Sequence, residues 1–183
     1  MVRFRAIATA LAGTILAAGS GCFAIAANDS CESTLPSALR SEITRHFKEW
    51  DLVRVSDLDE EDQALWSKAH GSACPGLAAG NFSGSYQLQF AVLLRKPRPS
   101  QRIQLLFAEE DKSGRFRIRS LLRQRVDRLS VVFATTRKGL ARQTNDRLPS
   151  RFTNDVIVLE TIEAGATGYY ITQGTFKSVV LSE

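Results

Sequence analysis

Three cysteines and their positions constrain this chain more than any other feature. Cys22 lies in an apolar N-terminal segment, whereas Cys31 and Cys74 lie in the more polar chain that follows it. Once such a segment is removed on export, two thiols are left, and two thiols in a small exported domain usually form a disulfide. A Cys31–Cys74 bond would close a loop of about 44 residues and stabilise the fold by roughly 4 kcal/mol through loop-closure entropy. We therefore expect a cross-linked domain that works in an oxidising compartment.

The N-terminal segment has the three parts of a secretory signal peptide. Two arginines supply its positive start, residues 6–18 are apolar, and Ala24-Ile25-Ala26 fits a cleavage site with small residues. We expect residues 1–26 to be a signal peptide and the mature protein to be periplasmic or secreted, with no membrane span after cleavage. Two alternatives stay open: a lipoprotein anchored at Cys22, and an uncleaved membrane anchor.

Residues 27–183 are long enough to form a single domain with its own core. Charge is distributed unevenly along them. Residues 28–70 carry ten acidic and five basic side chains, residues 71–94 carry none, and residues 95–128 carry eleven basic and four acidic ones. Such blocks are usually solvated faces, so charge complementarity within the fold is the first interpretation, and an anion-binding surface is the second.

Apolar residues at intervals of three or four predict two helices near the start of the mature chain. The first stripe consists of Leu35, Leu39, Ile43, Phe47 and Trp50. A short strand is expected over residues 52–55. Ser56 and Asp59 then form an S-x-x-D pattern that is typical of a helix start, and Gly71 is suited to end that helix.

From Tyr86 onward the apolar period changes to two, which predicts strands. The expected strands cover residues 86–94, 103–107, 116–122, 129–134 and 156–161, with a final hairpin over 169–181 and a long loop over 137–153. Short turns between the first three indicate an antiparallel meander. Helices first and strands afterwards favour an α+β domain, with two N-terminal helices packed on a mainly antiparallel sheet of about five to seven strands.

The Gly-rich segment between Cys74 and the first long strand contains Gly76, Gly80 and Gly84, which predict tight backbone turns. It resembles the G-D-F-x-G-D-G loop of FG-GAP repeats, which bind calcium through acidic side chains. The corresponding positions here are Asn81, Ser83 and Ser85, none of which is a carboxylate. Because calcium needs several hard oxygen ligands, the resemblance implies a structural turn without the ion.

Most of the mature chain also resembles a family of exported bacterial proteins with no assigned activity. The shared features are Trp50, Ser56-Asp57-Leu58, Asp62-Gln63-Ala64-Leu65-Trp66, the Cys74-Pro75-Gly76 turn, Phe82, Ala91-Val92-Leu93-Leu94 and Tyr169-Tyr170. Many members carry an acidic D-F-x-G-D-G loop, from which this chain departs. The resemblance implies the fold and export, and it transfers no catalytic residue.

Alternating arginines form the main candidate binding feature. Arg115, Arg117 and Arg119 are expected to share one face of a strand, opposite Phe116 and Ile118. Arg123, Arg125 and Arg128 extend the positive charge. Guanidinium groups bind carboxylates and phosphates in a bidentate fashion, so the stripe suits an anionic protein or an envelope polymer. We expect no nucleic-acid partner, because no aromatic residues interleave to stack bases. The alternative is the polar outer face of a one-sided sheet.

Catalytic and metal chemistry have little support in the sequence. The chain has two histidines, His46 and His70, and neither G-x-S-x-G nor H-E-x-x-H occurs. His46 and His70 could join Cys31 and Cys74 as metal ligands, but thiols in exported proteins tend to oxidise. We therefore predict no catalytic residue, no metal and no cofactor.

The sequence favours a non-enzymatic binding module of the cell envelope, of the inhibitor or immunity type. One alternative is a hydrolase of envelope polymers that would draw on Asp57, His70 or Asp155. A second alternative is a purely structural module with a degenerate calcium loop.

Overall fold

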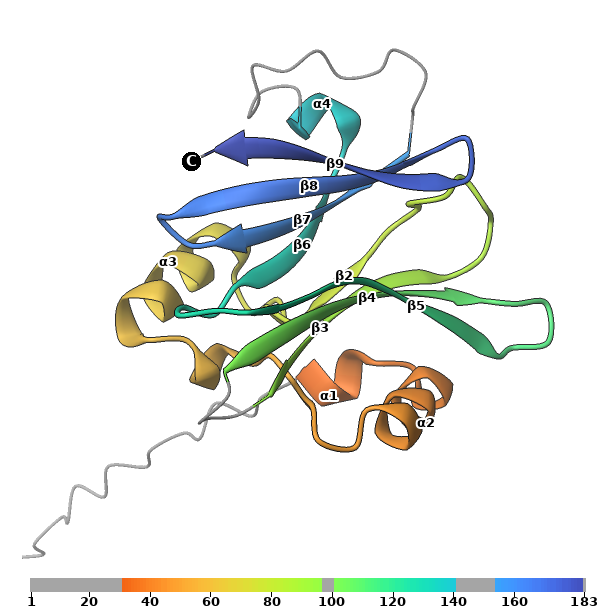
Figure 1. The fold of residues 1–183 in the computed structure, drawn as a ribbon, viewed down its shortest axis with the longest axis horizontal. Coiled ribbons are helices and arrows are strands. Elements are labelled where there is room, and N and C mark those ends of the chain that lie inside the picture. Colours follow the sequence, from red (N-terminus) through yellow and green to blue (C-terminus); the bar gives the residue numbers. More distant parts are fainter. Residues whose placement is uncertain (1–30, 97–100, 141–153, 183) are drawn as a thin grey trace, which may run out of the picture.

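The computed structural model describes residues 31–96, 101–140 and 154–182. The expected signal peptide, Cys22, the turn at residues 97–100 and residues 141–153 of the expected long loop lie outside the described residues. Within these ranges the protein is an α+β fold made mostly of strands, with four helices and two antiparallel sheets of five and four strands (Figure 1). No described helix is long and apolar enough to cross a membrane.

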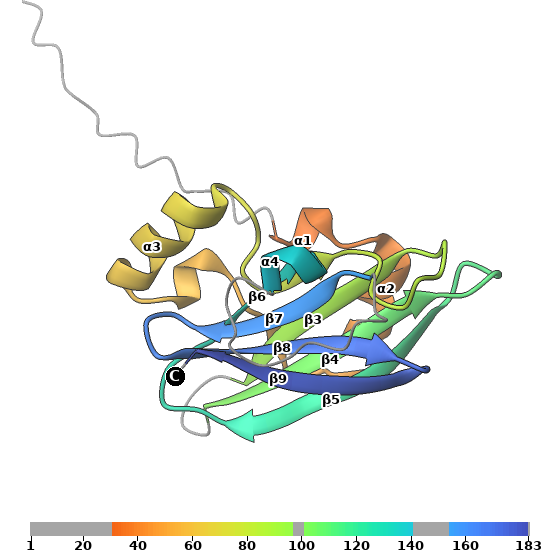
Figure 2. The ribbon, with the colours of Figure 1, turned by 90° about the horizontal axis from the view of Figure 1, so that it is seen from above.

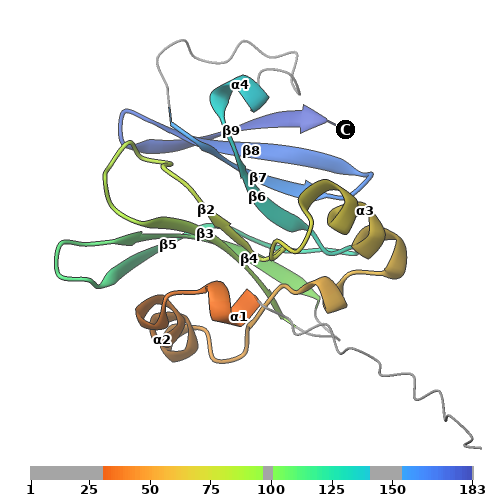
Figure 3. The ribbon, with the colours of Figure 1, turned by 180° about the vertical axis from the view of Figure 1, so that it is seen from behind.

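The nine described strands form two sheets, whereas the sequence predicted one sheet of five to seven. The first sheet contains β1 (Asp51–Leu52), β2 (Leu77–Ala79), β3 (Gln89–Lys96), β4 (Arg102–Glu110) and β5 (Phe116–Arg125). The second contains β6 (Val131–Thr135), β7 (Val156–Thr161), β8 (Gly165–Thr172) and β9 (Thr175–Ser182). Six consecutive residues of β3 and six of β4 are buried, so these strands need a cover on both faces. Helices cover one face and the second sheet covers the other (Figure 3).

Helices α1 (Cys31–Thr34) and α2 (Ser37–His46) lie on the outer face of the first sheet. Leu35, Leu39 and Ile43 are buried there, and they belong to one apolar cluster with Phe90, Val92, Leu94 and Leu106. The disulfide predicted from the sequence joins Cys31 to Cys74, with their Cα atoms 5.0 Å apart. It ties the start of the helical layer to the chain segment that enters β2.

Helix α3 (Glu60–His70) lies at one end of the two sheets (Figure 2). Its N-cap is Asp59, which accepts a hydrogen bond from the backbone N–H of Asp62 at 2.9 Å, so the helix begins later than Ser56. Gly71 ends it with a φ of 64°, as the sequence predicted. The short strand expected over residues 52–55 is confirmed in part, since β1 covers Asp51–Leu52, and a 3-10 helix, η1 (Val55–Asp57), begins at the last expected residue. The fourth helix, α4 (Arg137–Leu140), follows β6.

The first long strand begins three residues later than expected. β3 starts at Gln89, while Tyr86 and Leu88 lie in the preceding loop with their side chains 108% and 57% exposed. The prediction that residues 86–88 belong to this strand was therefore wrong. The side chain of Gln89 is 2% exposed and accepts hydrogen bonds from the backbone of Phe82 and Ser83, so it holds the loop before β3 in place.

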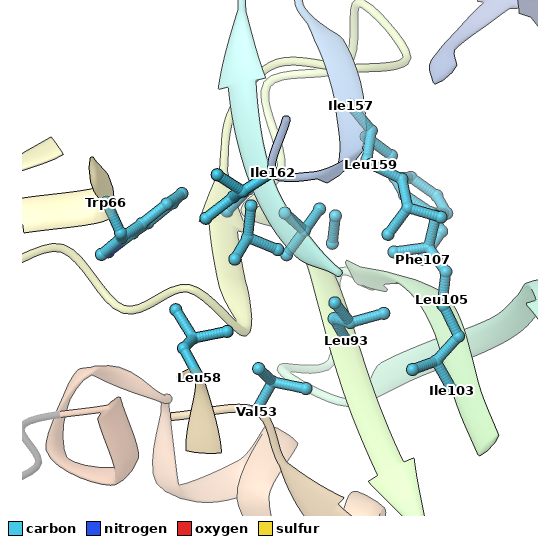
Figure 4. Packing of buried hydrophobic residues seen from close by; sticks show 14 of the residues in the cluster. Val53, Leu58, Trp66, Leu93, Ile103, Leu105, Phe107, Ile157, Leu159 and Ile162 are labelled. Atoms are coloured by element: carbon cyan, nitrogen blue, oxygen red, sulfur yellow. The ribbon is translucent and has the colours of Figure 1, made fainter. Parts of the chain in front are cut away.

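The main core lies between the two sheets (Figure 4). Its members include Leu93 and Leu105 from the first sheet, Ile157 and Leu159 from the second, and Trp66 from α3. At the edge of this core, the rings of Phe107 and Phe176 meet edge to face at 5.0 Å. A smaller cluster around Leu140, Val156 and Val158 fills the far face of the second sheet.

Candidate functional site

Three strands of the first sheet bring polar residues into adjacent rows on the face that looks toward the second sheet. Strand pairing places Gln89 opposite Glu109, and Glu109 opposite Arg117. The neighbouring row runs from Ala91 through Phe107 to Arg119. Paired residues of antiparallel strands share a face, so one surface changes from apolar to charged along the sheet.

A β-bulge divides the arginine stripe between two faces. The pairing shifts between Leu105 and Leu106, so Leu121 has no partner in the register. Before the bulge, Arg117 and Arg119 lie on the face toward the second sheet; after it, Arg123 and Arg125 lie on the opposite face. Because one inserted residue reverses the alternation, the six arginines do not form a continuous surface.

The remaining arginines have separate surroundings. Arg123 lies over the ring of Trp50 at 5.2 Å, which is a cation–π contact with the helical side. Arg128 donates a hydrogen bond to Asp62 at 2.9 Å. Arg117 and Arg119 are exposed, and no carboxylate in the described part of the chain forms an ion pair with either. Among the described residues Arg125 is also exposed without an ion pair, but it lies on the opposite face. Arg117 and Arg119 are therefore the unpaired arginines of the face toward the second sheet.

Burial explains why Arg117 and Arg119 stay in solvent although they share a face with the core. β5 is the last strand of its sheet, and in Figure 2 it extends past the second sheet. Phe107, in the neighbouring strand, is still covered by Phe176. The second sheet thus covers β4 but not this part of β5, so Arg117 and Arg119 face water.

The loop before β3 is held in place by Gln89. Its Oε1 accepts hydrogen bonds from the backbone N–H groups of Phe82 and Ser83 at 2.7 and 2.9 Å. Its Nε2 donates to Ser85 Oγ at 2.6 Å and to Glu109 Oε1 at 2.8 Å, and it also contacts the Ser83 hydroxyl. The two backbone donors fix the orientation of the amide, since only its oxygen can accept from them.

The hydrogen bonds of Gln89 bear on the expectation that this loop, which resembles a calcium-binding loop, is a structural turn without the ion. The hydroxyls of Ser83 and Ser85 and the carboxylate of Glu109 converge on one point, as cation ligands would. The Gln89 amide nitrogen stands at that point and supplies the hydrogen-bond donors. Asn81 closes the turn separately, because its Oδ1 accepts from the N–H of Gly84 at 2.8 Å. An internal amide therefore stabilises the loop here.

The opposite wall of the site is the β4–β5 turn. Asp111 Oδ1 accepts from the Ser113 hydroxyl at 2.5 Å, from the Ser113 N–H at 2.8 Å and from the Arg115 N–H at 3.2 Å. These hydrogen bonds, chiefly those from Ser113, lower the pKa of the Asp111 carboxyl. Gly114 completes the turn with a φ of 78°. The turn thus holds Arg115 in a defined position next to an ionised carboxylate.

The loop and the hairpin enclose an open cavity of about 370 Å³. Gln87 lines it from the loop, and the hairpin lines it with both signs of charge, from Glu109, Glu110 and Asp111 and from Lys112, Arg115 and Arg117. Tyr86 and Leu88 lie on either side of Gln87 in the chain, and both are exposed. We call Tyr86, Leu88, Arg115, Arg117 and Arg119 the arginine surface. Tyr86 and Leu88 were missed as surface residues because their alternation continues that of the strand.

The residues considered for hydrolysis do not converge. Asp57 pairs with Arg95 at 2.6 Å, Asp155 accepts from the N–H of Asn81 at 2.9 Å, and His70 stacks on Trp66 with ring centroids 4.0 Å apart. The residues considered for a metal are also separated. Cys31 and Cys74 are bonded to each other, and His46 lies 3.3 Å from Glu42 on the helical surface. In the described ranges no group of three histidine, cysteine, aspartate or glutamate residues is placed to hold a metal.

A scan against protein-family models found no match to this chain, and neither a search of curated proteins nor a search of solved structures found one. Functional inference therefore rests on the chemistry of the residues described above.

Proposed function

We propose that this protein is an exported, non-enzymatic binding module of the cell envelope that captures an anionic partner, in the manner of an inhibitor or immunity protein. The contact surface is the arginine surface. The observation that carries this proposal is that Arg117 and Arg119 are exposed and form no ion pair within the described chain, on the β4–β5 hairpin. Tyr86 and Leu88, in the loop across the cavity from this hairpin, are exposed as well.

The chemistry of this surface suits protein or polymer recognition. Tyrosine and arginine are enriched among the residues that dominate binding energy, and exposed arginines engage carboxylates or phosphates with paired N–H groups. The loop and turn are fixed by the Gln89 and Asp111 hydrogen bonds, so little conformational entropy is lost on contact. The Cys31–Cys74 disulfide suits an oxidising compartment, in line with export.

The arginine surface also protects the edge of its sheet. β5 ends the first sheet, and charged residues on edge strands discourage pairing with other chains. Edge protection alone explains the arginines, but it does not explain why Tyr86 is completely exposed in the loop across the cavity. A bound partner accounts for both features.

The bulge supplies a matched control for the test. Capture from an envelope extract is compared among the wild type, an Arg115→Ser/Arg117→Ser/Arg119→Ser variant and an Arg123→Ser/Arg125→Ser variant, which changes the opposite face. We expect a captured species with the wild type and the control, and loss of capture with the triple variant. Added salt should also weaken capture, because exposed charges are screened.

Capture that survives in the triple variant would remove the arginine surface as the contact. Equal loss in both variants would mean that net charge, rather than this surface, is responsible. Replacing Tyr86 with Ser then separates the aromatic contribution from the charge.

A further inference from the structure

A second cavity, of about 360 Å³, is lined by residues of α3 and of the end of β7 with the turn that follows it. These segments lie at the end of the molecule away from the β4–β5 hairpin (Figure 3). Leu65, Trp66 and Ile162 provide apolar walls, and His70, Glu160 and Glu163 provide the titratable groups. A volume of this size accommodates a small organic molecule. We call it the glutamate cavity.

Among the residues that the structure describes, both carboxylates of the glutamate cavity are without a cationic partner. No lysine, arginine or histidine in the described chain forms an ion pair with Glu160 or Glu163. Arg128 is paired instead with Asp62, in the first turn of α3, at 2.9 Å. Glu160 is half-buried, and this burial raises the pKa of its carboxyl. Partly desolvated negative charge is thus left uncompensated against an apolar wall.

His70 does not neutralise this charge. Its ring stacks on Trp66 at 4.0 Å and lies 4.8 Å from the ring of Phe133, and burial lowers the pKa of the imidazole from its ordinary value of 6.5. At neutral pH the imidazole is therefore uncharged. It contributes a flat aromatic surface rather than a cation.

The backbone at Glu163 is unusual as well. Its φ is 59°, a left-handed conformation that glycine and asparagine adopt more readily than glutamate. The tight turn from Thr161 to Gly165, closed by the Ala164 N–H to Thr161 carbonyl hydrogen bond at 2.9 Å, imposes this conformation. The turn therefore accounts for this backbone conformation, and it places Glu163 among the residues that line the cavity.

We propose that the glutamate cavity binds a small organic cation, an ammonium or guanidinium ion on an apolar or aromatic body. The apolar body packs against Leu65 and Ile162 and beside the His70 ring, and the cation lies between the carboxylates of Glu160 and Glu163. The driving force is charge complementarity in a partly desolvated site, where an ion pair is stronger than at an open surface. This site is independent of the proposed function of the arginine surface.

The pH dependence follows from the groups that line the cavity. Glu160 takes up its proton above the ordinary carboxyl value of 4.5, which removes one negative charge as the pH falls. Protonation of His70, which occurs below 6.5, adds a positive charge beside the ligand. Both changes disfavour a bound cation, so affinity should fall as the solution is acidified from pH 7 to pH 5.

The probe is phenethylammonium, titrated into the disulfide-bonded protein and followed by amide NMR shifts, with phenethyl alcohol as the uncharged ligand of similar shape. We expect saturable shifts at His70, Ile162 and Glu163 with the cation, and at least about tenfold weaker binding of the alcohol. Glu160→Gln should weaken cation binding by about tenfold, while Glu61→Gln, on an exposed part of α3 outside the cavity, should leave it unchanged.

Three results would each overturn the proposal. The first is equal binding of the alcohol and the ammonium ion. The second is unchanged affinity of the Glu160→Gln variant when its amide spectrum matches that of the wild type. The third is a set of shifts confined to residues away from the cavity, such as those around Glu109 and Asp111.

Discussion

The arginine surface and the glutamate cavity lie at opposite ends of the same two sheets, and they present charge in different ways (Figures 1 and 3). Arg117 and Arg119 are exposed on an edge strand, where water screens them. Glu160 and His70 are partly buried against apolar residues. Burial favours the neutral form of each group, so it raises the pKa of Glu160 and lowers the pKa of His70. Exposed charge suits recognition of a large partner, whereas a few partly desolvated charges suit a small ligand.

The two regions should differ most in how far they contribute to stability. Trp66 is 2% exposed, belongs to the main core and donates from its Nε1 to the Ala73 carbonyl at 2.8 Å. Trp66→Ala should lower the free energy of unfolding by about 3–5 kcal/mol, because it leaves a large cavity. The matched change on the arginine surface, Arg119→Ser, should alter it by less than about 0.5 kcal/mol. Urea unfolding of both variants measures the difference, and equal effects would abolish the contrast.

The arginine surface depends on a buried polar group rather than on apolar packing. Gln89→Leu would leave the N–H groups of Phe82 and Ser83 without their acceptor, and it would remove one of the hydrogen bonds that Glu109 accepts. We expect a loss of about 2–4 kcal/mol in stability, since buried unsatisfied groups each cost about 1–3 kcal/mol.

Hydrogen exchange locates this effect. Amide protection should fall mainly over residues 80–88 and stay close to wild type around Glu160. Uniform loss of protection across both ends would show that the Gln89 network supports the whole fold and not this loop alone.

The smallest expected effect concerns Glu160 in the absence of ligand. Its folded pKa is raised above 4.5, so its contribution to stability is fully present below that pH and is lost as the pH rises through the folded pKa. Glu160→Gln should therefore stabilise the protein at pH 7, by less than about 1 kcal/mol because the group is half exposed. The gain should shrink toward pH 4.5. Melting temperatures measured across this range test the sign, and a destabilised variant at pH 7 would contradict it.

Local signals in the sequence predicted much of the architecture. The period of two located the meander of β3, β4 and β5, and the strand at residues 156–161 begins and ends as expected. The Cys31–Cys74 pair followed from counting thiols. These predictions succeed because side-chain alternation and turn residues act over a few neighbours.

The same local signals failed where a distant contact decides the outcome. Tyr86 continues the alternation of β3 in the sequence, but its side chain is exposed to solvent. The loop that contains it is held by Gln89, which donates a hydrogen bond to Glu109 on the neighbouring strand. The unpaired Leu121 moves Arg123 to the opposite face from Arg119, and nothing in the alternation of the arginines marks this bulge. The glutamate cavity joins α3 to a turn nearly a hundred residues away in the sequence, so it has no local signature.

By itself the sequence determined the disulfide, the α+β class and the presence of an arginine-rich strand. The tertiary structure alone decided that the strands divide into two sheets, which arginines stay unpaired in water, and which carboxylates are left partly buried. The physical reason is that alternation and capping are set by adjacent residues. Exposure and charge compensation depend instead on which segments the folded chain places against one another.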